Sequence, residues 1–213
     1  MKPGDELRHR LRAATAQIHE RLHGHEGLGA AASGAIARAD YRLLLARLWG
    51  FHKAFEGVLE DATRTLGLAI DMKARARAPM LEADLATLGY SALQIAALPR
   101  CGAMFRPRNA PECLGALYVV EGSTLGGVHI ARALSSLFDG EGGEGRKFFL
   151  GYGAAHGAMW RGFLDQLDVF SGDEAREAQA IEGAIRTFAD FESWMDGWGE
   201  DPAAGSATPP AAH

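Results

Sequence analysis

His19 is the side chain of this sequence best placed to bind a metal ion or a metal-containing group. Ile18 and Leu22 belong to an apolar stripe with the spacing of an amphipathic helix, and His19 lies at the edge of that stripe. On its other side, Arg8 and Arg12 lie within about 20° of His19 on a helical projection. Haem needs such a combination: an imidazole for its iron, apolar surface for its ring and cations for its propionates. Taken alone, however, a histidine at such a border is more often an ordinary surface or hydrogen-bonded residue than a ligand.

The same turns of the helix contain a sharper motif, the H-E-x-x-H pattern of zinc proteases, at residues 19–23. In such enzymes two imidazoles one turn apart bind zinc, and the glutamate beside the first acts as general base. No third ligand follows here at a recognisable spacing, since the other histidines are scattered along the chain. Zinc hydrolysis is therefore disfavoured. A di-iron bundle is disfavoured too, because it needs Glu-x-x-His on two helices and Glu20-x-x-His23 stands alone.

Three glycines interrupt the helical pattern of a long apolar segment. Each interior glycine costs about 1 kcal/mol relative to alanine, so Gly122, Gly126 and Gly127 are expected to serve a purpose. Close packing against another helix, or a kink, would explain them. Alternatively, Gly122 and Gly126 lie one turn apart on one face, where they let a flat ligand approach the backbone. Ser123 and Thr124 add hydroxyl groups in the same turn, which can order water or a bound ligand.

These residues are expected to be positioned by helices, because apolar residues recur at three- and four-residue spacings along the chain. No segment alternates apolar and polar residues between hairpin turns, so strands are not expected. Asp40 is a candidate N-cap, and Pro79 is expected to divide or kink its segment. The predicted helices span about residues 7–22, 40–59, 71–88, 112–137, 148–167 and 173–198. The predicted loops include residues 24–37, 99–111 and 139–145.

The fold class that follows is a single all-α domain, which the length of 213 residues allows. No internal repeat divides the chain into smaller units. The domain is expected to cover residues 1–198. Residues 199–213 are rich in alanine, proline and glycine, and are expected to form a disordered tail.

Composition disfavours several classes of function. The formal net charge of −5 argues against a nucleic-acid-binding protein, since such proteins carry basic surfaces that neutralise phosphate. Residues 41–51 form the most apolar stretch, but Arg42 and Arg47 interrupt it, so no membrane span is expected. The N-terminus lacks the apolar core of a signal peptide. Because Cys101 and Cys113 are too few for a disulfide framework, a reducing, cytoplasmic location is the expectation.

Two of these segments together resemble the haem oxygenase family. Residues 11–19, Leu-Arg-Ala-Ala-Thr-Ala-Gln-Ile-His, are similar to the family's first-helix pattern of leucine, threonine and proximal histidine. Residues 122–127, Gly-Ser-Thr-Leu-Gly-Gly, stand where the family has its glycine-rich distal helix. Residues 40–45, 148–153 and 159–163 are also similar, especially to bacterial members found beside bacteriophytochromes. The resemblance covers nearly the whole chain.

The resemblance implies a single-domain helical bundle that holds haem between the first helix and a glycine-kinked distal helix. His19 would be the proximal ligand and therefore the metal-binding residue. Gly122, Ser123 and Gly126 would be the catalytic positions over the haem. The cofactor-binding residues that the family pattern implies are Arg12, Thr15, Gly122, Gly126, Gly127 and Arg161.

The reaction implied by the resemblance consumes O2 and electrons, uses haem as both cofactor and substrate, and yields biliverdin, CO and ferrous iron. The implied partners are a reductase or ferredoxin as external electron donor and a bacteriophytochrome as biliverdin acceptor. Two positions depart from many members: Ser123 replaces an aspartate that orders a distal water, and His23 replaces a hydrogen-bonding acid. Since a hydroxyl supplies no charge, the alternative is a haem-binding carrier or sensor that does not degrade haem.

Overall fold

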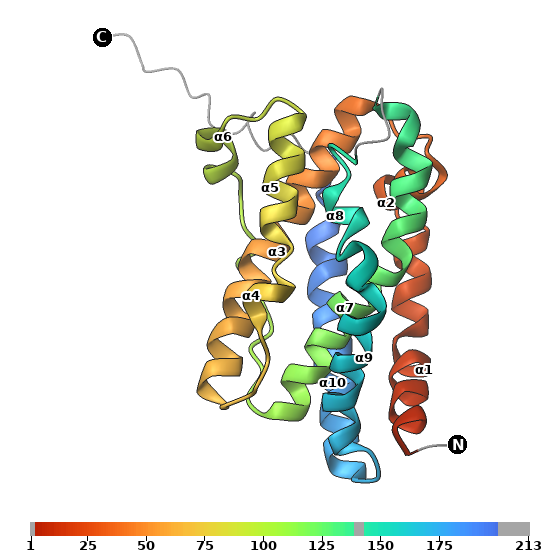
Figure 1. Ribbon diagram of the computed structural model, residues 1–213, viewed down its shortest axis with the longest axis vertical. Helices are drawn as coiled ribbons and strands as arrows, with labels where there is room; N and C mark the ends of the chain where they lie inside the picture. Colours follow the sequence, from red (N-terminus) through yellow and green to blue (C-terminus); the bar gives the residue numbers. More distant parts are fainter. Residues whose placement is uncertain (1–2, 139–142, 200–213) are drawn as a thin grey trace.

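The computed structural model describes residues 3–138 and 143–199, and its regular structure within them is entirely helical (Figure 1). The prediction of an all-α fold is therefore confirmed. The α-helices are α1 (Pro3–His23), α2 (Glu26–Ser33), α3 (Arg38–Thr65), α4 (Met72–Arg75), α5 (Ala78–Thr87), α6 (Ala92–Ala96), α7 (Ala110–Ala133), α8 (Lys147–Leu150), α9 (His156–Leu167) and α10 (Glu174–Met195). Short 3-10 helices are η1 (Leu134–Leu137), η2 (Gly153–Ala155) and η3 (Asp168–Phe170).

Two clusters of buried apolar side chains hold the bundle together. One cluster joins α3 to α5 and α8 and includes Trp49 and Phe149. The other joins α1 to α7, α9 and α10 and includes Leu11, Leu117 and Phe163. In Figure 1, α10 accordingly lies in the middle of the bundle, with α3 and α5 on one side and α1 on the other. Burial of this apolar surface is the main force that assembles the helices.

α7 and α10 cross through glycine on both sides of their contact. A Cβ atom on Gly115 of α7 would overlap the carbonyl oxygen of Ala180, and one on Gly183 of α10 would overlap that of Glu112. The two backbones approach this closely only because neither glycine has a side chain. This crossing packs α7 directly against α10 in the middle of the bundle. α7 is the helix that contains the predicted distal glycines.

One predicted loop contains a helix. Residues 24–37 are predicted above as a loop, but α2 occupies the middle of that range. The His25 side chain accepts a hydrogen bond from the Leu28 N–H and caps the first turn. Gly34, with φ of +72°, ends the helix in the left-handed conformation. The prediction was wrong because the glycine- and alanine-rich composition conceals a helix that is stabilised at its ends and by burial of Ala31.

Two predicted boundaries also shift. α3 begins after Ala37, which makes no side-chain cap hydrogen bond, so Asp40 is not the N-cap. Asp40 lies instead in the first turn, where its negative charge favours the positive end of the helix dipole. The loop predicted at 99–111 ends earlier, because the Asn109 side chain accepts a hydrogen bond from the Glu112 N–H and caps α7.

Two predicted segments are divided. Pro79 lies in the first turn of α5 and separates this helix from α4, so the division predicted there is confirmed. The segment 148–167 is predicted as one helix, but α8, η2 and α9 share it. Gly151 and Gly153 have φ angles of +53° and +54°, which a right-handed helix does not accommodate. The glycines therefore end α8 and turn the chain before α9 begins.

Two further predictions fall largely outside the described residues. Residues 139–142 of the loop predicted at 139–145 are not described, and neither are residues 200–213 of the predicted tail. The domain boundary at residue 198 and the disorder of the tail therefore stay predictions.

Among the described residues, one helical span, Ala110–Leu137, is long and apolar enough to cross a membrane. This span lies in α7 and η1, not in residues 41–51. However, more than half of its most apolar part is buried inside the fold, where α7 packs against α10 and α8. The span therefore serves as a core helix of the bundle.

Candidate functional site

His19 lies on α1 as an exposed residue whose ring is partly covered by its neighbours. Its ring meets the rings of His23 and Phe188 edge-on, with centroids 4.6 Å and 6.3 Å away. No hydrogen bond from the described residues reaches either ring nitrogen. Partial burial of the ring lowers the pKa of His19, and the neighbouring His23 lowers it further. A lowered pKa favours the neutral imidazole, which is the form that binds a metal ion.

The other two residues predicted on α1 have different environments. Thr15 is buried, and its hydroxyl donates a hydrogen bond to the Leu11 carbonyl at 2.8 Å, so this group is already engaged within the helix. Arg12 is exposed and pairs with no carboxylate among the described residues. Burial raises the pKa of Tyr118 on α7, while the positive charges of Arg12 and Arg8 lower it. The guanidinium of Arg12 on α1 is therefore close enough to α7 for its charge to act on the Tyr118 hydroxyl.

The three predicted glycines of α7 differ in what surrounds them. A Cβ atom on buried Gly127 would lie 2.5 Å from the Phe149 carbonyl oxygen, so this glycine allows α8 to pack on α7. A Cβ atom on Gly122 would lie 4.0 Å from the Trp160 ring, which is ordinary contact. Gly126 is exposed, with no atom within 4 Å of its Cβ position. Close packing thus explains Gly127, whereas Gly126 leaves open space over the backbone.

Two hydroxyl groups bond back to the backbone of α7 beside these glycines. Exposed Ser123 donates to the Val120 carbonyl and buried Thr124 donates to the Glu121 carbonyl, both at 2.7 Å. Bonds of this type, next to glycine, are a recognised cause of helix bending. In Figure 1, α7 runs obliquely through its first half and nearly vertically through its second half. The bend falls in the segment where the predicted catalytic residues lie.

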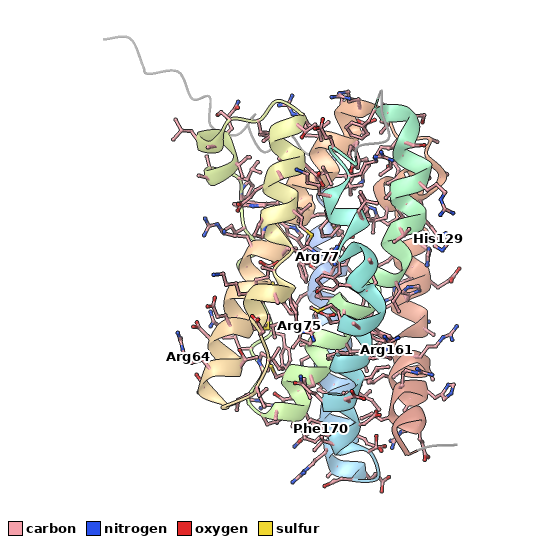
Figure 2. The ribbon with its side chains drawn as sticks, viewed as in Figure 1. Arg64, Arg75, Arg77, His129, Arg161 and Phe170 are labelled. Atoms are coloured by element: carbon pink, nitrogen blue, oxygen red, sulfur yellow. The ribbon has the colours of Figure 1, made fainter. Side chains whose placement is uncertain are left out.

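Arg161 provides a second exposed cation near α1. It lies on α9, on the side next to α1 in Figure 2, and pairs with no carboxylate among the described residues. Its guanidinium folds back along α9, where it lies 3.3 Å from the position that a Gly157 Cβ would take. Arg12 and Arg161 are thus both exposed cations without a carboxylate partner among the described residues, and their role in binding an anionic ligand stays a prediction.

A buried polar cluster that the sequence did not predict lies behind the glycine segment of α7. Arg75 Nη1 and Glu121 Oε2 are 2.7 Å apart and form a buried ion pair. The Tyr152 hydroxyl donates to Glu121 Oε1 at 2.9 Å, and the pKa of Tyr152 is raised by burial and by Glu121. We call Arg75, Glu121 and Tyr152 the α7 anchor, because they tie α7 to α4 and to the turn before η2. The one available signal was a glutamate inside an apolar helical segment.

A second group of buried polar side chains adjoins the α7 anchor. Arg77 lies over the Phe148 ring, 4.6 Å from its centroid, and donates to the Phe148 carbonyl. Figure 2 shows Arg75 and Arg77 in the middle of the molecule, between α4–α5 and α8–α9. Burial and, as the smaller cause, the nearby charge of Arg77 lower the pKa of His52 to about 3. His52 is therefore neutral, and its Nδ1 lies 4.0 Å from Glu56 Oε1 without forming a charged pair.

A comparison with known protein families places this arrangement. A family model described as Heme oxygenase matches residues 5–197 of the chain. The chain belongs to the haem oxygenase family. The family is one of oxidoreductases, and the prediction from the two helix motifs is confirmed. No curated protein sequence matches the chain.

Solved structures of haem oxygenases share the fold. The enzyme of Neisseria meningitidis is 24% identical, with a TM-score of 0.69 over 97% of this chain and 98% of its own. That of Leptospira interrogans is 14% identical, with a TM-score of 0.72 over 89% and 98%. Haem oxygenase 2 of Synechocystis, solved with haem and NO, is 18% identical, with a TM-score of 0.68 over 90% and 84%. At these identities the likeness establishes the fold.

Proposed function

We propose that this haem oxygenase family member opens haem to biliverdin, consuming O2 and electrons and releasing CO and ferrous iron. The observation that carries the proposal is the state of His19. His19 is exposed, its pKa is lowered in the direction that favours the neutral imidazole, and its ring has no hydrogen-bond partner among the described residues. A neutral imidazole with a free nitrogen is the form that binds haem iron.

The surroundings of His19 also fit haem. Half-buried Ile18 offers apolar surface for the porphyrin, and the largely buried Phe188 ring lies edge-on beside His19. Arg12 and Arg161 are exposed cations of the kind that binds propionates. The open space over Gly126 allows a flat group to approach the backbone of α7. These features together match the chemical requirements of the ligand.

Each residue has a separate role in the proposed site. When bound, haem supplies the iron that activates O2 and the ring that is opened. His19 would bind the iron, and Arg12 and Arg161 would orient the propionates. Gly122 and Gly126 have no side chains, so they would let the haem ring lie close to the backbone of α7. Gly127 acts indirectly by letting α8 support α7 at Phe149, and Thr15 acts through its bond within α1.

Ser123 supports a second candidate function. Its hydroxyl proton is already donated to the Val120 carbonyl, so its oxygen can accept a hydrogen bond but has no second proton to donate. A site that delivers protons poorly would bind haem without degrading it. A haem carrier or sensor on the same fold is therefore the alternative.

We also propose the partners and location that suit this reaction. Electrons come from an external reductase or ferredoxin, and a bacteriophytochrome accepts the biliverdin. The reaction takes place in the cytoplasm. Residues 1–198 form the catalytic domain, and residues 199–213 form its tail.

Substitution of His19 tests the proposed function. Wild-type protein is expected to bind one hemin with a sharp Soret band, and His19→Ala is expected to lose that axial ligation, because no imidazole remains at this position. His9→Ala, which removes another exposed imidazole of α1, is the matched control and should bind hemin as the wild type does. An unchanged ligation spectrum in His19→Ala would contradict the assignment.

The same complex separates the two candidate functions. With reductant and O2, the Soret band is expected to decay while the absorption of biliverdin grows at longer wavelength. Chromatography then identifies the biliverdin isomer. A complex that stays intact under these conditions would favour the carrier or sensor.

Gly126→Leu tests whether open space on α7 is needed for haem. The leucine side chain would project into the space that no atom of the described fold occupies, so folding is expected to survive while hemin binding or turnover is lost. Circular dichroism should remain helical, and a hemin titration measures the loss. Gly57→Leu on α3, which also has no atom within 4 Å of its Cβ position, is the control. Full binding and turnover in Gly126→Leu would refute the backbone-approach argument.

A further inference from the structure

The H-E-x-x-H motif at residues 19–23 is left unexplained by haem binding, which needs only one of its histidines. Zinc hydrolysis is not a use for it, because the described residues contain no group of three or more potential metal ligands. The motif therefore offers two imidazoles from one helix and no third protein ligand.

The separation of the two imidazoles is close to the one that a shared metal ion requires. His19 and His23 are both exposed and one turn apart on α1, and their ring centroids are 4.6 Å apart with planes inclined at 71°. Zinc–imidazole bonds of about 2.0–2.1 Å at the tetrahedral angle put the centroids of two ligating rings about 5.2 Å apart. The observed separation of 4.6 Å is slightly shorter, so side-chain rotations that move the two rings a little apart would turn one nitrogen of each toward a shared ion.

The charge of Glu20 acts on His19, but Glu20 and the two histidines do not form a group of three metal ligands in the described structure, so water is left to complete the coordination. Phe188 borders His19 with an apolar ring that cannot bind a metal ion. Glu192, on the same helix as Phe188, is held by Arg21 through bonds of 2.6 Å and 2.8 Å. Imidazole nitrogen favours zinc, copper and nickel over magnesium or calcium, which prefer oxygen ligands.

We propose that His19 and His23 of the haem-free protein chelate one divalent transition-metal ion such as Zn²⁺, Cu²⁺ or Ni²⁺, with water completing its coordination. The ion and haem then exclude each other, because both require His19; this second statement rests on the proposed function. Metal ions of this class would thereby reduce the fraction of protein able to take up haem.

A zinc titration of the haem-free, tag-free full chain tests the metal site. Competition with a chromophoric chelator is expected to report one Zn²⁺ ion per chain. His23→Gln and His19→Gln should each weaken binding at least about tenfold, because one ligand alone loses the benefit of chelation. His9→Gln, which alters an exposed histidine on the same helix, should bind zinc as the wild type does. Equal zinc affinity in wild type and His23→Gln, or equal weakening in His9→Gln, would overturn the proposal.

Hemin titrations with and without Zn²⁺ separate this proposal from the proposed function. Zinc should weaken hemin binding by the wild type and should have little effect on hemin binding by His23→Gln. If zinc binding depends on both histidines but leaves hemin binding unchanged, the metal site stands and the shared role of His19 is wrong. If zinc binding ignores His23 while His19→Ala still loses haem ligation, the metal site is wrong and the proposed function stands.

Discussion

The free energy of unfolding of the Glu121→Ala variant is expected to be about 3–5 kcal/mol lower than that of the wild type, because the substitution leaves the buried Arg75 guanidinium without its partner. Only 9% of the Arg75 side chain and 1% of the Glu121 side chain are exposed, so water cannot take the place of the missing carboxylate. The Tyr152 hydroxyl also loses its acceptor. Urea unfolding followed by circular dichroism measures the change.

Two further variants show whether burial of the pair causes this effect. Glu182→Ala removes the carboxylate of an exposed pair with Arg186, and is expected to change stability by no more than about 0.5 kcal/mol. Arg75→Met combined with Glu121→Met should recover part of the loss, since it removes both charges and leaves only Tyr152 without an acceptor. A Glu121→Ala variant as stable as Glu182→Ala would show that the α7 anchor does not stabilise the fold.

Gly115→Ala is expected to lower the free energy of unfolding by about 3 kcal/mol or more, at the upper end for an overpacked core. The added methyl group would overlap the Ala180 carbonyl oxygen, which belongs to the backbone of α10 and cannot rotate away. α7 and α10 would have to separate, and the apolar contacts around their crossing would be lost. Gly183→Ala tests the same crossing from α10, where the methyl group would meet the Glu112 carbonyl oxygen.

Gly57→Ala is the matched control for this prediction. Gly57 lies inside α3 with no atom within 4 Å of its Cβ position, so alanine is expected to stabilise the protein by up to about 1 kcal/mol. Both variants introduce the same methyl group into a long helix, and only the space around it differs. If Gly115→Ala were as stable as Gly57→Ala, the close approach of α7 to α10 would be wrong.

The helical period made most of the fold predictable, and its failures have local causes. α1, α7 and α10 carry apolar residues at helical spacing, and their extents were close to the observed ones. α2 was missed because its apolar face is made of glycine and alanine, which carry little periodic signal. The break after α8 was missed because Gly151 is an unremarkable residue until its positive φ is known.

The sequence by itself determined the all-α class, the candidate ligand His19 and the unusual glycine segment of α7. These features depend on the type and spacing of residues within one helix, and both can be read from the amino-acid sequence. Only the tertiary structure decided that Gly127 is a packing residue while Gly126 faces open space. It also revealed the ion pair between Arg75 and Glu121. Such contacts join backbones and side chains from separate helices, so no local pattern records them.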